Sequence, residues 1–253
     1  MVPALLWLYE VPTLVDVALG IAWPLALLFM AITGVLLVAD LKRPERFLWV
    51  LLRPQWSSWL VRGAYGITLY NGVLFAGWLL DKDSDTSLGA ILMIVGGLLG
   101  SFVAAYSGWL FGQAKGRDMW QSALSPLHLG LQAVVAGAAA LLLLNPVELE
   151  VLVLMLMVAL VLETSFVLLD VHGRHSTEAA RRAAHSILEG RRGIIYWVGV
   201  LGLGRIMPMI ILCLLYFLYP GSSLVMIPAL LILLGIALWE HLWVEAPQRL
   251  PLA

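Results

Sequence analysis

Three ionisable side chains lie within apolar stretches of the sequence, where a charge is costly. Glu163 and Asp170 are seven residues apart, a spacing that puts both on one face of a helix. Glu163 lies about eight residues, or roughly 12 Å of helix, inside its stretch. Arg205 is the deepest cation, and the glycines and the proline of residues 202–208 predict a distorted helix around it. Ionisable groups at such depth are typical of proton routes.

The same three residues also have a structural interpretation. Glu163 could form a hydrogen bond between helices, and Arg205 could satisfy backbone carbonyls that a distorted helix leaves free. Arg205 could equally pair with Glu163 or with another carboxylate. The residues alone therefore leave two hypotheses open, a proton route through Glu163, Asp170 and Arg205 or a set of structural contacts.

Tyr106 is a candidate for contact with a flat ligand. It lies about two helical turns from a polar segment at residues 113–123, and the small residues Ser107, Gly108 and Gly112 leave room around it. A phenol in this position can donate a hydrogen bond to a quinone carbonyl while aromatic residues enclose the ring. The alternative is a tyrosine packed in the core or in an interfacial belt of aromatic residues.

The elements that must hold these side chains are long apolar helices. The chain has 253 residues, of which 62% are hydrophobic and 12% are charged, whereas charged residues supply about a quarter of a globular sequence. Because the apolar stretches are continuous rather than alternating, an all-α polytopic transmembrane bundle is predicted and a closed barrel is not. About seven spans are expected, at residues 13–39, 59–80, 88–112, 124–144, 149–170, 194–218 and 222–243.

The organisation expected is a single membrane domain over residues 1–253. We place a first bundle at about residues 13–144 and a second helical group at about residues 149–243. A polar connector at about residues 171–193 interrupts the second group. Between Ser176 and Gly190 it alternates alanines with basic residues, which is typical of an amphipathic interfacial helix.

Lysine and arginine gather on one side of the predicted membrane. That side holds residues 40–62, 113–123, 171–193 and the C-terminal end, whereas the opposite loops carry only Lys82 beside three aspartates. The positive-inside rule puts the basic side in the cytoplasm, so an odd number of spans puts the N-terminus outside. The same basic loops could instead form a docking surface for an acidic protein.

Few residues are suited to a metal centre or to haem. Cys213 is the single cysteine, so disulfides and cysteine-ligated zinc or clusters within this chain are excluded. Ligation of haem by two histidines needs imidazoles that face each other across helices, but only His128 and His241 lie near spans and both lie at the same edge. We therefore expect no metal, no haem and no nucleic-acid partner. A transporter or a scaffold stays open, favoured only by Gly204 and Pro208.

Three segments carry a resemblance to a known family. The first is Asp40–Phe47, which continues through Arg53–Ala64 and is rich in arginine, proline and tryptophan. The second is Gly112–Trp120 followed by Pro126–His128, and the third is Trp239–Leu252. In this order they resemble the NrfD/PsrC family, the quinone-reactive membrane subunits of polysulfide, thiosulfate, tetrathionate and related molybdoenzyme reductases.

The resemblance implies a subunit that passes electrons between the quinone pool and an attached partner. The cofactor would be menaquinone or ubiquinone, bound without a covalent bond. The implied partners are a four-cluster ferredoxin-like iron–sulfur subunit and a molybdopterin-type catalytic subunit, with this chain in the inner (cytoplasmic) membrane. Quinone contact would fall to Tyr106, with Asp40, Arg43, Gln113 and His128 on the same side.

Two further expectations follow from the resemblance. The docking face for the iron–sulfur partner would consist of five basic residues, Arg46, Arg53, Arg62, Lys115 and Arg117. The family usually has eight or more spans, and here the Asp40 segment already follows the first one. The family's first helix is therefore expected to be absent, and a passive anchor without quinone binding is the alternative function.

Overall fold

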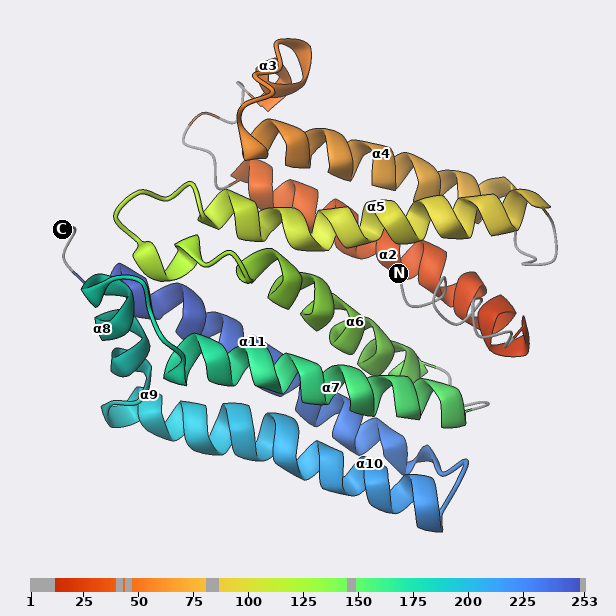
Figure 1. Cartoon of the computed structure of the whole chain (residues 1–253). Coiled ribbons are helices and arrows are strands. Elements are labelled where there is room, and N and C mark those ends of the chain that lie inside the picture. Colours follow the sequence, from red (N-terminus) through yellow and green to blue (C-terminus); the bar gives the residue numbers. More distant parts are fainter. Residues whose placement is uncertain (1–11, 40–42, 44–46, 81–86, 145–148, 251–253) are drawn as a thin grey trace. The chain divides into compact units, whose positions relative to one another are not determined.

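The computed structural model describes residues 12–39, 43, 47–80, 87–144 and 149–250. Every regular element among these residues is a helix, which confirms the predicted all-α class (Figure 1). The long helices are α2 (Pro12–Ala39), α4 (Trp59–Leu80), α5 (Ser87–Phe111), α6 (Ser125–Leu144), α7 (Leu149–His172), α10 (Met207–Leu218) and α11 (Met226–Gln248). The shorter ones are α3 (Phe47–Leu52), η2 (Asp118–Gln121), α8 (Glu178–Ile187), α9 (Gly190–Ile194), η3 (Ile195–Ile206) and η4 (Ser223–Val225).

All seven predicted stretches form long helices, and the protein is a multi-pass membrane protein. Within the described residues, five stretches are long and apolar enough to cross a membrane, Leu88–Phe111, Ser125–Leu144, Glu150–His172, Gly190–Leu218 and Ser223–Gln248. The described apolar part of α2, Trp23–Ala39, is shorter. Helix α4 has 22 residues, but tyrosines and Asn71 lower its mean hydropathy. The side of the membrane that each loop faces stays a prediction.

The chain divides into two compact units, Met1–Ser107 and Gly108–Ala253. In the first unit α2 packs on α4, and α3 packs on the same helix. The Trp23 ring of α2 fits against Gly77, where an added Cβ would lie 2.8 Å from ring atoms. The Tyr65 hydroxyl donates a hydrogen bond to the Leu51 carbonyl at 2.6 Å, which ties α3 to α4.

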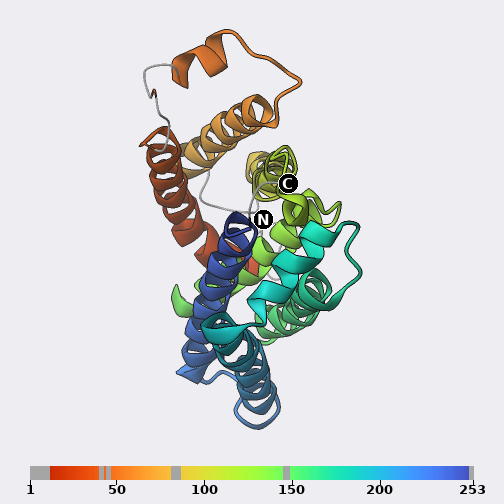
Figure 2. The ribbon, with the colours of Figure 1, turned by 90° about the vertical axis from the view of Figure 1, so that its left-hand side faces the viewer.

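In the second unit α11 packs against both η3 and α6, and α6 packs against α7. Residues Gly190–Leu218 form one continuous rod of α9, η3 and α10 in Figure 1, and Figure 2 shows several of the helices of this unit nearly end-on. The grouping of residues 13–144 as one bundle stays a prediction, and α6 packs on helices that follow it in the chain.

Helix α8 closes one end of the second unit. It buries Ala180, Ala183 and Ile187 against the core and exposes its charged residues to the outside, so it is amphipathic. The Thr177 hydroxyl accepts a hydrogen bond from the Ala180 amide at 3.1 Å and caps the helix. The connector that the sequence predicts at residues 171–193 therefore contains a capped surface helix.

Three aromatic rings form the centre of the core next to α8. Phe111 lies 5.0 Å from Trp120 and 5.2 Å from Trp243, measured between ring centroids, and the two indoles are 6.1 Å apart. The Trp120 ring N–H donates a hydrogen bond of 3.1 Å to the Trp243 carbonyl. This contact joins the polar segment after α5 to α11.

Candidate functional site

Four charged or titratable side chains meet inside the second unit. His128 comes from α6, Glu163 and Asp170 come from α7, and Arg205 comes from η3. Glu163 is 0% exposed and Arg205 is 2% exposed, so neither side chain reaches solvent. The structure therefore brings together the three residues of the predicted proton route and one residue of the predicted quinone contacts.

The centre of this group is a two-point ion pair. The Arg205 Nη2 lies 2.6 Å from Glu163 Oε1, and Nε lies 3.0 Å from Oε2. The remaining Nη1 donates a hydrogen bond to the Val200 carbonyl at 2.9 Å. Arg205 thus makes both contacts that the sequence left as alternatives, because its planar fork can serve a carboxylate and a carbonyl together.

The helix around Arg205 is distorted as its glycines and proline predict. Residues Ile195–Ile206 form a π-helical segment, and the Met207 amide bonds to the Gly202 carbonyl, five residues back. At Gly204 a Cβ would collide with the backbone of Gly235 on α11. The two glycines let the backbones approach closely, which holds η3 against α11 and aims Arg205 at α7.

His128 links the ion pair to the second carboxylate. Its Nδ1 lies 3.0 Å from Asp170 Oδ2. Its Nε2 lies 3.6 Å from Glu163 Oε1, which is within ion-pair range and too long for a hydrogen bond. The ring stacks on Phe166, with centroids 5.7 Å apart, and lies 5.9 Å from Trp239. An imidazole held between two carboxylates can accept a proton at one nitrogen and release one from the other.

The structure adds two polar residues that the sequence reasoning did not place in this group. Gln132 is buried one helical turn after His128, and its Nε2 has no hydrogen-bond partner among the described residues. Glu240 of α11 lies within electrostatic reach of His128, Gln132 and Glu163. The four-residue spacing between His128 and Gln132 was a usable signal, since it puts both side chains on one helix face.

Tyr106 belongs to the first unit, where it is 7% exposed. Its ring lies against α4 at Gly63, and an added Cβ at that glycine would overlap the ring carbons. Phe102, one turn earlier, stacks on Tyr106 with centroids 6.3 Å apart and occupies the space beside Gly66. Two glycines of α4 therefore accommodate two aromatic rings of α5.

The other predicted quinone contacts are distributed over both units. Asp40 lies outside the described residues, and Arg43 is exposed in the first unit. Gln113 is exposed in the second unit, which also contains His128. The contacts between these residues and a quinone stay predictions.

The predicted docking residues have different surroundings. Arg46 lies outside the described residues. Arg53 and Arg62 are exposed in the first unit, where their guanidinium groups stack over Trp49 and Trp59 at 4.9 and 4.6 Å from the ring centroids. Each arginine therefore presents its charge at the surface next to an indole.

Lys115 and Arg117 belong to the second unit, and their surroundings differ. Lys115 is exposed. Arg117 is half-buried, and its Nη1 donates hydrogen bonds to the carbonyls of Pro247 and Leu250 at 2.6 and 2.8 Å. Arg117 thus ties the polar segment to the end of α11. Across the residues with described positions, no group of three His, Cys, Asp or Glu could hold a metal ion.

Comparison with protein families identifies the family of this chain. A family model described as polysulphide reductase, NrfD, matches residues 15–249. The matched range contains every helix from α4 to α11 and all described residues of the buried polar group. No curated protein matches the chain.

Proposed function

The chain belongs to the NrfD (polysulphide reductase) family of membrane subunits of oxidoreductase complexes, and from this premise we propose that it exchanges electrons between a quinone and an iron–sulfur partner. The membrane anchor role follows from the family and from the spanning helices. The quinone role and the identity of the partners are the parts that we propose. A quinone takes up two electrons and two protons to become a quinol, so the chain must position a ring and move protons.

The observation that carries the quinone assignment is the buried phenol of Tyr106 beside Phe102. The two stacked rings suit a flat aromatic ligand in chemical type, and the phenol O–H can donate to a carbonyl oxygen. Gly63 fixes the place of the Tyr106 ring, because no side chain intervenes between the ring and α4. We propose that Tyr106 orients the quinone by this hydrogen bond.

We assign proton movement to the buried group of the second unit. Asp170 lies two residues before the end of α7 and is partly exposed, whereas Glu163 is fully enclosed. His128 lies between them and can take a proton on the Asp170 side and release one on the Glu163 side. Arg205 holds Glu163 in place and offsets its charge, which keeps the carboxylate from being isolated in an apolar interior.

The partners that we propose are an iron–sulfur subunit and, through it, a molybdopterin-type catalytic subunit. Exposed cations that remain available for docking are Arg53, Arg62 and Lys115. Arg117 contributes by holding the polar segment to α11 instead of meeting the partner directly. Acidic residues of a partner that meet these cations would raise the association rate and fix the register.

Replacing Tyr106 with Phe tests the quinone assignment. The variant removes one hydroxyl and keeps the ring, so the complex should assemble normally and quinone-linked turnover should fall about tenfold, the effect of one lost hydrogen bond. Tyr70→Phe is the matched control, because Tyr70 is a half-buried tyrosine of the same unit and loses the same hydroxyl. Turnover should be measured in the purified complex with a soluble quinol analogue, together with the content of bound quinone.

Two results would contradict the assignment. Unchanged turnover in Tyr106→Phe would remove Tyr106 from the quinone site. A purified complex that holds no quinone and binds no quinone-site inhibitor would favour the passive anchor.

A further inference from the structure

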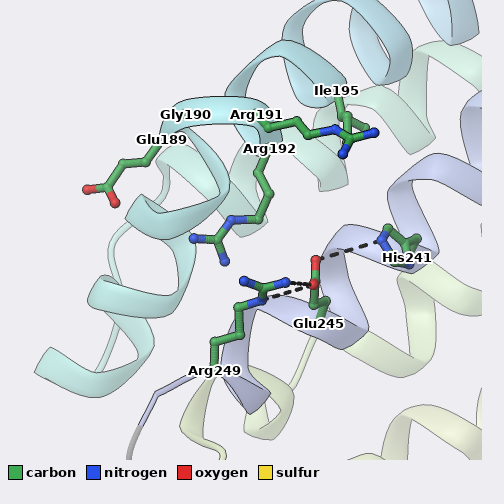
Figure 3. A pocket seen from close by; sticks show the side chains of 8 residues that line it. All are labelled: Glu189, Gly190, Arg191, Arg192, Ile195, His241, Glu245 and Arg249. Carbon is green, nitrogen blue, oxygen red and sulfur yellow. Dashed lines mark hydrogen bonds and ion pairs between the residues drawn. The ribbon is translucent and has the colours of Figure 1, made fainter.

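A cavity of about 530 Å³ lies in the second unit, where the turn after α8 meets the last turns of α11 (Figure 3). It is separate from the buried group of His128, Glu163, Asp170 and Arg205. Its lining is mostly charged and consists of Glu189, Gly190, Arg191, Arg192, Ile195, His241, Glu245 and Arg249. Three arginines against two glutamates leave the lining net positive when His241 is neutral.

Both glutamates of the lining already have partners. The Glu245 carboxylate accepts a hydrogen bond from Arg249 Nε at 2.9 Å and a second one from Nη2. The Glu189 carboxylate meets His185 Nδ1 at 3.0 Å, and in Figure 3 its side chain points away from Arg192 and Arg249. Both carboxylates of the lining therefore already have a hydrogen-bonding partner beside them.

The two adjacent arginines have no hydrogen-bonded partner of this kind, and Arg192 is attracted to Glu245 only over a longer distance. Within the described part of the chain, neither Arg191 nor Arg192 forms an ion pair, and the Arg192 Nη1 is buried without a hydrogen-bond acceptor. Figure 3 shows Arg192 pointing toward Arg249 and Glu245. Gly190 has a φ of +52°, a backbone conformation that favours glycine and turns the chain into Arg191 and Arg192. A buried guanidinium N–H without an acceptor is costly, so the cavity suits an anion.

The surroundings of the cavity identify the kind of anion. The cavity lies at the ends of two spanning stretches, Gly190–Leu218 and Ser223–Gln248. Directly after the arginines, Ile194, Trp197 and Val198 are exposed apolar residues on the same rod, and Trp197 is 54% exposed. In a membrane such residues face lipid, and tryptophan is enriched at the level of the headgroups. A molecule with a phosphate for the arginines and acyl chains for this surface is a phospholipid.

We propose that this cavity binds the phosphate headgroup of an anionic phospholipid, with its acyl chains along Ile194, Trp197 and Val198. Arginine forks recognise phosphate oxygens in pairs, and basic pockets at the ends of spanning helices bind anionic headgroups. Zwitterionic lipids fit less well, because their ammonium group would meet a lining whose net charge is positive. The site does not depend on the quinone chemistry proposed for Tyr106, so either assignment can fail alone.

Lipid binding to the purified full-length chain in detergent tests this proposal. Native mass spectrometry should show that phosphatidylglycerol binds and that phosphatidylcholine at the same concentration binds much more weakly. The double variant Arg191→Gln with Arg192→Gln should bind phosphatidylglycerol about 30-fold more weakly, as expected for the loss of two arginines at a membrane surface. Raising the salt concentration should weaken binding to the wild-type protein.

The matched control is Arg181→Gln with Arg182→Gln, ten residues earlier. It changes the charge equally, but these arginines are exposed on α8 and are paired with Glu178. This control should bind phosphatidylglycerol like the wild type. Replacing Arg191 and Arg192 with Lys keeps both charges, removes the forked geometry and should give an intermediate affinity.

Several results would overturn the proposal. Equal binding of the two lipids by the wild-type protein would do so without any variant. Complete competition by millimolar inorganic phosphate would assign the cavity to a free anion. An equal loss of lipid in the control pair would show that only net charge matters. If the Arg191→Gln, Arg192→Gln variant still bound phosphatidylglycerol but no longer co-purified with a partner subunit, the cavity would be a protein-docking surface.

Discussion

In the first unit, glycines make room for two aromatic rings. In the second unit, buried charged residues are paired with residues of opposite charge. Tyr106 and Phe102 lie where Gly63 and Gly66 offer no Cβ. Glu163, by contrast, is enclosed together with Arg205 and next to His128. A neutral ring needs space in an apolar bundle, and a charge needs a counter-charge. The two units are therefore expected to tolerate very different substitutions.

The largest effect is expected from removing one member of the buried ion pair. Glu163→Leu leaves the Arg205 guanidinium buried without its main partner, so the free energy of unfolding should fall by about 3–5 kcal/mol. Thermal unfolding in detergent measures this loss. The double variant Glu163→Leu with Arg205→Met should recover most of the stability, because no lone charge remains.

Glu150→Leu, at the exposed start of the same helix, is the control for this prediction. If Glu163→Leu unfolds no earlier than Glu150→Leu, the stability of the second unit does not depend on the pairing of its buried charges.

The next effect should come from filling a glycine position in the first unit. In Gly63→Ala the new methyl group overlaps the Tyr106 ring, so stability should fall by about 1–3 kcal/mol. Gly72→Ala on the same helix has open space around it and should be neutral or stabilising by up to about 1 kcal/mol. The two variants should shift the unfolding midpoint in opposite directions. Equal shifts would show that the first unit does not depend on the space that Gly63 leaves for the ring.

A smaller effect is expected when the outer carboxylate of the buried group loses its charge. Asp170→Asn keeps the shape of the side chain and a hydrogen-bonding oxygen near His128, so the fold should persist. If Asp170 moves protons, quinone-linked turnover should slow about tenfold, or 1.4 kcal/mol in the barrier. Turnover in proteoliposomes tests this, and Asp118→Asn in η2 should leave the rate unchanged. A normal rate in Asp170→Asn would make its ion pair with His128 purely structural.

The smallest effect should come from an exposed ion pair of the second unit. Hydrogen bonds from Arg181 and Arg182 hold the pKa of the Glu178 carboxyl below its ordinary value. Its stabilising contribution is therefore present above the ordinary carboxyl pKa and is lost as pH falls through the lowered one. Unfolding midpoints of wild type and Glu178→Gln should differ slightly near neutral pH and converge in acid. A difference as large as that of Glu163→Leu would contradict the contrast between buried and exposed charge.

The helix positions could be predicted from the sequence because apolar length alone determines them. The helix distortion around Arg205 could also be predicted from the sequence, since glycine and proline weaken a helix locally. The partners of His128 could not be predicted from the sequence. Glu163 and Asp170 follow it by 35 and 42 residues, and α7 is apolar on nearly all sides. A helix without a polar face gives no signal for which side turns inward. Arg117 shows the same limit, since its acceptor carbonyl lies 130 residues away in the sequence.

The contact between Trp120 and Trp243 has a spectroscopic consequence. Two of the eleven tryptophans of the chain lie with ring centroids 6.1 Å apart, with Phe111 against both. Indoles this close couple electronically, so they should give a strong near-ultraviolet circular dichroism band that vanishes when the polar segment leaves α11. This band would therefore report, without an added label, whether the polar segment at residues 113–123 is packed against α11.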